Sequence, residues 1–313
     1  MSGISLFQPP LPDVGIEIDS SYVALARLSW RGGRSTVSSH VVEPLPAGAV
    51  VPSLSAPNIP DPTVVSGIIS QALARLGGRA ARAALVIPDT AAKISLVRFD
   101  KVPGSTADLA ELVRWQVRKS APFPIDQAVV SFTPGARSAE GGQEYIVTLA
   151  RADIIGEYEQ TCARAGIHVG LVDIATSSII NSVLASPVAP ASDASGEGRP
   201  QSGASRGDWL LVHATETYTT LVVLRGTDVI FFRHRDRDGE GTLTDVVHQT
   251  AMYYEDRLKG AGFNRVLLAG GAVNGVEAVH RSLEQRLEVR IEPVAQPDLA
   301  ALVGILTRER QAA

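Results

Sequence analysis

The stretch VGIEIDSSYVALARLSW, residues 14–30, contains two apolar runs separated by the polar turn Asp19-Ser20-Ser21. A glycine-containing turn and a third run, residues 35–42, follow it. A second stretch, LLVHATETYTTLVVLRGTDVIFFR at residues 210–233, has the same layout around the turn Thr215-Glu216-Thr217. Apolar and β-branched runs of this length between turn residues are typical of strands. We therefore expect two three-stranded antiparallel meanders.

Each meander is followed by one predicted helix and one predicted strand. The helices are expected over residues 64–76 and 243–258, where apolar residues recur at helical spacing. The strands are expected over residues 83–87 and 265–269. A duplicated unit of meander, helix and strand is the layout of the two-lobed α/β fold called actin-like or ribonuclease-H-type. A chain of 313 residues is long enough for each lobe to have its own core.

The first lobe carries a predicted insertion. We expect strands at residues 94–99, 128–132, 145–150 and 169–172, and helices at 108–119 and 153–165. This pattern predicts a small α+β subdomain over residues 93–173, inserted between residues 1–92 and 174–185 of the first lobe. Residues 208–313 form the predicted second lobe.

The segment SPVAPASDASGEGRPQSGASRG, residues 186–207, separates the two lobes. It is rich in Ser, Pro, Gly and Ala and has few side chains to bury, so it is predicted to be a flexible linker.

The composition excludes several classes of protein. The net charge of −4 gives no general electrostatic reason to bind nucleic acid, and no apolar run approaches the roughly 20 residues that span a bilayer. No secretory signal is visible, so we expect a cytoplasmic protein. The single cysteine, Cys162, is expected to be buried, and the six histidines show no metal-ligand spacing. The alternating charges from Arg233 to Asp238 are expected to be a solvated surface run.

Several motifs resemble those of the type IV pilus assembly protein PilM family, over residues 14–307 apart from the linker. Gly15-Ile16-Glu17-Ile18-Asp19-Ser20-Ser21 resembles the family's first phosphate loop. Arg114-Trp115-Gln116 with Ala121-Pro122-Phe123-Pro124-Ile125 resembles its tryptophan helix and Pro-Phe-Pro turn. Ala165-Gly166-Ile167 leading to Val172-Asp173-Ile174 resembles a later strand entry, and Arg265 to Gly271 resembles the adenosine loop. The helix with its Pro-Phe-Pro turn favours PilM over FtsA and the type II secretion L proteins, which remain alternatives.

The resemblance implies a partner. In that family, the inserted subdomain and the neighbouring lobe hold an N-terminal peptide of the inner-membrane protein PilN. We expect a similar peptide partner here, membrane association only through partners, a homo-oligomer, and Trp115, Phe123 and Val97 as partner-binding residues. An extended peptide could pair with a free strand edge, for which residues 94–99 are the candidate.

The resemblance also implies ATP with Mg²⁺ as the candidate cofactor, held by Glu17, Ser20, Ser21, Gly270 and Gly271. This chemistry needs glycine where the backbone approaches phosphate, and carboxylates near the metal.

The sequence departs from that pattern at four positions. Asp19 and Thr215 stand where the turns normally have glycine, Ala24 replaces a lysine, and His213 replaces an aspartate. At ~4 Å and an effective dielectric near 20, repulsion between Asp19 and a phosphate is of order 4 kcal/mol before screening. We therefore expect a degenerate site on a non-catalytic scaffold, with an active ATPase or a filament-forming protein as the alternatives.

Overall fold

The computed structural model describes residues 12–31, 34–78, 82–137, 141–186, 207–237, 242–270 and 276–312. The predicted linker is outside this set except for its first and last residues, Ser186 and Gly207. Gly271 is outside it as well.

The first lobe is built on a five-stranded sheet with the order β3-β2-β1-β4-β8. Its strands are β1 (Val14–Ile18), β2 (Tyr22–Arg31), β3 (Arg34–Pro44), β4 (Arg82–Ile87) and β8 (His168–Ile174). β1 pairs antiparallel with β2 and parallel with β4, and β8 is an edge strand. Alternate residues point to opposite faces of such a sheet, so Val14, Ile16 and Ile18 all reach one core. Helices α1 (Pro62–Arg75) and α3 (Ala152–Arg164) cover that face.

The second lobe repeats the arrangement with the order β11-β10-β9-β12-β13. Its strands are β9 (Asp208–Ala214), β10 (Tyr218–Arg225), β11 (Asp228–Asp236), β12 (Arg265–Ala269) and β13 (Ile291–Pro293). Helix α5 (Leu243–Leu258) packs on its outer face, and α6 (Val276–Leu287) contributes the buried Leu283. A capping box between Thr242 and Asp245 fixes the start of α5.

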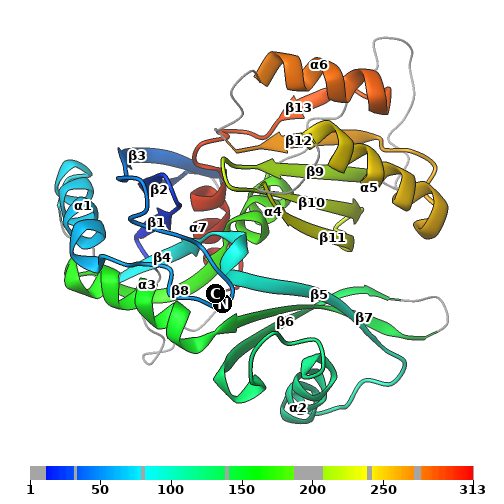
Figure 1. The fold of residues 1–313 in the computed structure, drawn as a ribbon, viewed down its shortest axis with the longest axis horizontal. Coiled ribbons are helices and arrows are strands. Elements are labelled where there is room, and N and C mark those ends of the chain that lie inside the picture. The colour runs from blue at the N-terminus through cyan, green and yellow to red at the C-terminus, as the bar shows by residue number, and fades with distance from the viewer. Residues whose placement is uncertain are drawn as a thin grey trace.

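Two helices lie between the sheets, as Figure 1 shows: α4 (Ala175–Ala185) and α7 (Ala300–Ala312). Their apolar residues form one core with the inner faces of both sheets. The two helices approach closely at Gly304, where a Cβ atom would lie 1.7 Å from the carbonyl oxygen of Ser178. Only glycine fits at this crossing.

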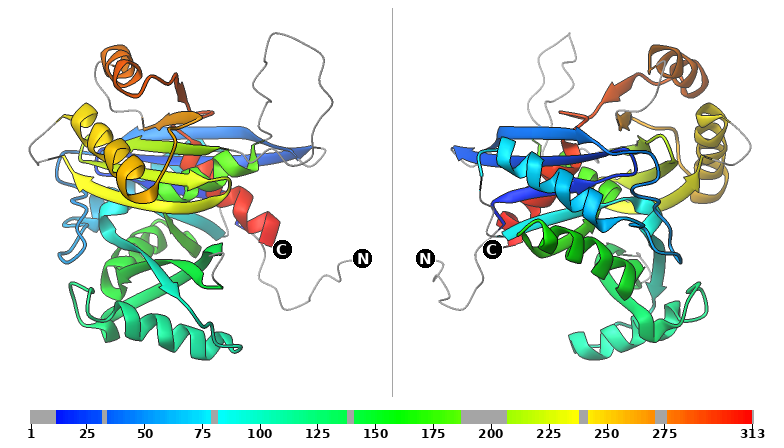
Figure 2. Two further views of the ribbon diagram at one scale, coloured as in Figure 1. Left: turned by 90° about the vertical axis from the view of Figure 1, so that its right-hand side faces the viewer. Right: turned by 60° about the vertical axis from the view of Figure 1, so that its left-hand side comes forward.

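The inserted unit is a three-stranded antiparallel sheet with the order β5-β7-β6. Its strands are β5 (Ala92–Phe99), β6 (Ala128–Arg137) and β7 (Gln143–Arg151), and short 3₁₀ turns precede β5 (η1, Asp89–Ala91) and β6 (η2, Ile125–Gln127). Helix α2 (Thr106–Val117) covers one face of this sheet and lies at an extremity of the molecule (Figures 1 and 2).

The predicted elements agree with the structure to within a few residues at their ends, and α5 has its predicted bounds. The helices α4, α6 and α7 and the strand β13 were not predicted. The predicted insertion included α3 and β8, whereas β8 pairs in the first-lobe sheet and α3 packs on that sheet. The prediction for the charged run was wrong in its first part. Residues 233–236 form the end of β11, and His234 is largely buried, with 24 % of its side chain exposed. Local charge alternation did not reveal that this strand faces the cleft between the lobes.

Candidate functional site

Two hairpin turns face each other across the cleft between the lobes, at residues 19–21 and 215–217. They border two hollows. The larger, about 1000 Å³, lies on the side of β5 and β11, and the smaller, about 470 Å³, lies on the side of Gly270. The smaller hollow is the one that contains Glu17 and His213 at the ends of β1 and β9, so it is the candidate nucleotide site.

The first turn is closed on itself by Asp19. Its Oδ1 atom accepts hydrogen bonds from Ser20 Oγ at 3.0 Å, from the Ser21 backbone N–H at 3.2 Å and from Ser21 Oγ at 3.3 Å. Both serine hydroxyls and one backbone donor thus point at a carboxylate of the protein itself. A phosphate would need those donors, so Asp19 competes with it for the same hydrogen bonds.

The carboxyl group of Glu17 is buried beside this turn, where it accepts a hydrogen bond from the Tyr22 hydroxyl at 3.1 Å. Burial, with the nearby charge of Asp19 as the next cause, raises the pKa of Glu17 to about 8, although the Tyr22 hydrogen bond lowers it. Glu17 is therefore mainly protonated at neutral pH. Binding of hydrated Mg²⁺ by Glu17 would therefore require release of this proton.

The second turn is also closed by its own side chain. Thr215 Oγ1 accepts hydrogen bonds from the backbone N–H groups of Thr217 at 3.3 Å and Tyr218 at 3.1 Å. These are donors that a glycine at residue 215 would leave for a ligand.

The lobes are joined behind these turns by a buried polar cluster that comprises Asp89, Thr176, His213, Thr220 and His234. Asp89 is 1 % exposed and accepts hydrogen bonds from the Thr176 backbone N–H at 2.9 Å, the Thr176 hydroxyl, and Thr220 Oγ1 at 2.7 Å. The Nδ1 atom of His213 lies 2.8 Å from Thr176 Oγ1 and 3.5 Å from Asp89 Oδ2, and His234 Nδ1 lies 3.0 Å from Thr220 Oγ1. Because both threonine hydroxyls donate to Asp89, the histidine Nδ1 atoms are the donors to the threonines.

This environment favours the ionised form of Asp89. Burial by itself raises the pKa of Asp89, but the hydrogen bond and charge of His213, together with the hydrogen bonds from Thr176, lower it to about 2. Asp89 and Thr176 come from the first lobe, and His213, Thr220 and His234 from the second. The hydrogen bonds of this cluster thus connect the two lobes.

The charge around the smaller hollow is one-sided. Its lining includes the carboxylates of Asp19, Glu216 and Asp298, besides the mainly protonated Glu17, whereas no lysine or arginine is found among its described lining residues. Gly270 has a φ of +97°, and a Cβ there would lie 2.0 Å from the Ala214 carbonyl oxygen, so the glycine is required by the fold.

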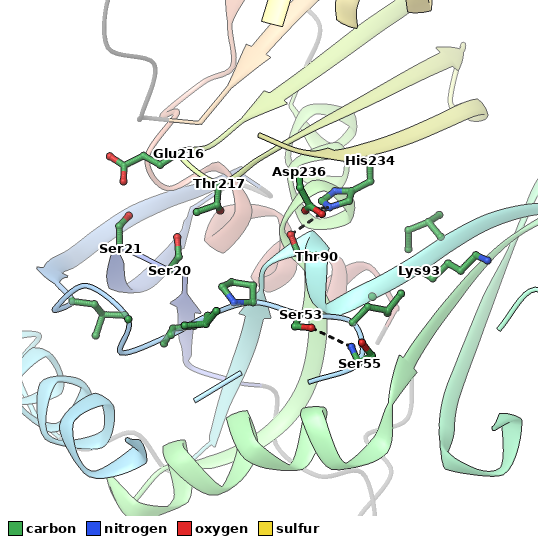
Figure 3. Close-up of a pocket in the computed structure, with 18 of the residues that line it drawn as sticks. Ser20, Ser21, Ser53, Ser55, Thr90, Lys93, Glu216, Thr217, His234 and Asp236 are labelled. Atoms are coloured by element: carbon green, nitrogen blue, oxygen red, sulfur yellow. Dashed lines mark hydrogen bonds and ion pairs between the residues drawn. The ribbon is translucent and has the colours of Figure 1, made fainter. Parts of the chain in front are cut away.

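The larger hollow is shown in Figure 3, with Ser20 and Ser21 on one wall and Thr217, His234 and Asp236 on the other. Thr90 bridges the walls, since its Oγ1 lies 3.3 Å from His234 Nε2. Within the described ranges, no group of three His, Cys, Asp or Glu side chains is arranged to hold a metal ion.

The three predicted partner-binding residues do not share a surface. Val97 is buried in the core beneath α2, and Phe123 packs at the margin of the same core. Trp115 points outward from α2 and is 65 % exposed. β5 is an edge strand as expected, but the start of its free edge borders the larger hollow.

A second candidate surface lies on the opposite face of the inserted sheet from α2. There, Val129, Ser131 and Thr133 of β6 and residues 171–174 of β8 line a groove of about 160 Å³. Both β6 and β8 are edge strands of their sheets, and Val129 is 48 % exposed. Two strand edges with an apolar floor between them can receive an extended peptide through backbone hydrogen bonds.

Sequence reasoning missed Asp89, Thr176 and Thr220 and the groove between β6 and β8. Asp89 carried one usable signal, because it lies two residues after the end of the mainly apolar strand β4. Nothing local pointed to Thr176 or Thr220, which lie 87 and 131 positions away from Asp89 in the sequence.

Comparison with known proteins identifies one matching family. The family model described as type IV pilus assembly protein PilM matches residues 15–262. The match extends through the first lobe and the inserted unit and includes about half of the second lobe, up to the end of α5.

Solved structures share the fold. A structure described as a PilM–PilN type IV pilus biogenesis complex is similar with a TM-score of 0.78 at 18 % identity, covering 96 % of this chain and 99 % of that chain. The cytoplasmic domain of EpsL, an inner-membrane component of the type II secretion system of Vibrio cholerae, is similar with a TM-score of 0.53 at 9 % identity, covering 96 % and 94 %. Identities this low establish the fold alone, and that fold is the predicted actin-like one.

Proposed function

Because this chain belongs to the type IV pilus assembly protein PilM family, we propose that it is a scaffold that holds the cytoplasmic tail of an inner-membrane protein of the PilN type. In this proposal the chain is cytoplasmic and reaches the inner membrane through that tail. Among the residues that the structure describes, no helix is both long and apolar enough to cross a bilayer. Assembly of several copies into a ring is part of the same proposal.

The observation that carries the proposal is the groove between β6 and β8. An extended tail lying there could pair with either strand edge while its apolar side chains contact Val129 and Leu171. Ser131, Thr133 and Thr148 supply hydroxyl groups along the same wall. The groove also contains one carboxylate, Asp173. Cytoplasmic segments next to membrane spans are rich in lysine and arginine, so the charge of Asp173 complements such a tail.

The proposed scaffold does not hydrolyse ATP. Asp19 and Thr215 use the donors of both turns, and the smaller hollow is lined by the carboxylates of Asp19, Glu216 and Asp298. ATP carries several negative charges, so these features disfavour its phosphates. The cluster around Asp89 connects the two lobes through hydrogen bonds.

Tail binding can be tested with a fluorescent peptide that corresponds to the N-terminal cytoplasmic segment of the PilN-type protein from the same organism. The substitution Val129→Asp places a charge on the groove floor and is expected to weaken binding at least tenfold in fluorescence anisotropy. Val64→Asp on α1 is the matched control, because Val64 is 39 % exposed but lies outside the groove. Equal affinity for the wild type and Val129→Asp would refute the proposed groove.

Nucleotide binding can be tested separately by calorimetry with ATP and Mg²⁺. The wild type is expected to give no binding heat. The double variant Asp19→Gly/Thr215→Gly frees the donors of both turns, and any binding by this variant alone would identify the two side chains as the obstacle. Micromolar binding by the wild type would contradict the degenerate site and favour a nucleotide-dependent ATPase.

A further inference from the structure

The exposed tryptophan of the inserted unit lies on a surface that the proposed tail groove does not use. Trp115 is on the outer side of α2, whereas the groove is on the opposite face of the inserted sheet. The buried side of α2 is formed by Leu109, Val113 and Val117. Trp115 therefore contributes nothing to that core and leaves 65 % of its surface in solvent.

Two basic groups lie beside Trp115 at the C-terminal end of α2, and the exposed carboxylate of Glu111 is one helical turn before it on the same face. A shallow hollow of about 460 Å³ is lined only by Trp115, Gln116, Arg118 and Lys119. Arg118 lies three positions and Lys119 four positions after Trp115, so both lie on its side of the helix end. The hollow thus combines a large aromatic ring with two cations and has no carboxylate in its lining.

The shape of the molecule leaves this surface accessible. Figures 1 and 2 show α2 at one end of the molecule, with the inserted sheet between it and both lobes. A broad, flat partner can approach the outer side of α2 without meeting the lobes. A bilayer is such a partner, and tryptophan flanked by lysine and arginine is the combination that proteins place at the membrane–water interface.

We propose that Trp115, Arg118 and Lys119 form a direct contact with an anionic phospholipid surface. The two cations contact lipid phosphates, and the indole ring enters the headgroup region. This contact goes beyond the proposed function, since it would add a direct lipid contact to the predicted attachment through a partner. One aromatic anchor with two cations gives weak, reversible binding, which favours a role in orienting a chain that a membrane protein already holds nearby.

The first test uses the protein's own tryptophans. Trp209 is 8 % exposed and Trp30 is partly buried, so Trp115 is the residue whose emission should respond to lipid. Titration with phosphatidylcholine vesicles containing phosphatidylglycerol is expected to shift the emission to shorter wavelength. Pure phosphatidylcholine vesicles should have little effect, and Trp115→Phe should abolish the shift.

Vesicle flotation then tests the cations. Removing two cations should weaken binding about 30-fold, or ~2 kcal/mol, so Arg118→Gln/Lys119→Gln is expected to show that loss. Arg257→Gln/Arg290→Gln is the matched control, because both arginines are exposed on the second lobe and the charge change is the same. Equal losses in the two double variants would mean that binding follows overall charge, and the proposal would be wrong.

Two other outcomes would also overturn the proposal. One is the absence of any spectral shift with phosphatidylglycerol vesicles. The other is a shift that appears only with an acidic polypeptide such as poly-glutamate, which would make this a protein-docking surface. The tail peptide should bind Trp115→Phe and the wild type equally, so failure of the lipid contact leaves the groove proposal independently testable.

Discussion

Glu17→Gln is expected to stabilise the protein, and the gain should grow with pH. The substitution keeps the size of the side chain and an oxygen that can accept the Tyr22 hydrogen bond, which is 3.1 Å long in the wild type. It removes a buried group that would be negatively charged at neutral pH in the unfolded chain.

The magnitude follows from the pKa of Glu17, which rises from 4.5 to about 8 on folding, mainly through burial and secondarily through the charge of Asp19. A group whose pKa is raised by folding gives its full contribution to the free energy of unfolding below its unfolded pKa. That stabilisation is lost as the pH rises through the folded pKa. Between pH 4.5 and 8 the folded chain must bind a proton that the unfolded chain releases. The resulting penalty is below ~1 kcal/mol at pH 5 and about 3 kcal/mol at pH 7.

Urea unfolding of the wild type and Glu17→Gln at pH 5, 7 and 8 measures this difference. The two free energies of unfolding should be close at pH 5 and should diverge as the pH rises. Glu216→Gln is the control, since Glu216 is exposed in the neighbouring turn and its substitution should change stability by less than about 0.5 kcal/mol. A variant that is less stable than the wild type at pH 8, or a difference that does not depend on pH, would refute the argument.

Two further predictions concern the junction of the lobes. Asp89→Asn replaces the buried carboxylate that accepts hydrogen bonds from Thr176 and Thr220 and is expected to cost about 2–3 kcal/mol at pH 7, measured by urea unfolding. Because the pKa of Asp89 is lowered from 3.8 to about 2, its stabilising contribution is present above pH 4 and lost as the pH falls through 2, so the acid sensitivity of the wild type should be reduced in the variant. Gly304→Ala is expected to cost more than about 3 kcal/mol, because its Cβ would lie 1.7 Å from Ser178 O. Gly67 lies on the exposed side of α1, and an added Cβ would have no atom within 4 Å. Gly67→Ala should therefore increase the free energy of unfolding by up to about 1 kcal/mol and raise the melting temperature. A melting temperature for Gly304→Ala equal to that of the wild type would show that α4 and α7 can separate at no cost.

The sequence was sufficient to indicate the fold class, because the strands and helices that define this class arise from local patterns. The alternation of Val14, Ile16 and Ile18 selects one face of a sheet, and the spacing of apolar residues in α5 selects one face of a helix. Such periodicities arise from the backbone geometry of each element and can be detected within ten to twenty residues. The repetition of the same pattern in residues 210–233 was enough to indicate two similar lobes.

The candidate site could be predicted only in part from the sequence. Asp19 and Thr215 were recognised as departures from glycine, and each indeed uses the donors of its own turn. The raised pKa of Glu17 could not be derived, because burial by the other elements is its main cause. The assignment of Val97 to the partner surface also lacked the information that its side chain faces α2.

By itself, the sequence determined most of the strands, the helices α1, α2, α3 and α5, and the presence of two similar lobes with an insertion. It did not indicate α4, α6, α7 or β13, nor that α3 and β8 belong to the first lobe. Only the tertiary structure decided which edges and polar groups meet. The groove needs β6 and β8 to end two different sheets side by side, and the Asp89 cluster needs residues from both lobes. The physical reason is that a hydrogen bond requires its two atoms to lie about 3 Å apart in space. The residues that contact Asp89 are 87 or more residues away from it in the sequence. The packing of the sheets on α4 and α7 brings these groups together, and no local pattern encodes that juxtaposition.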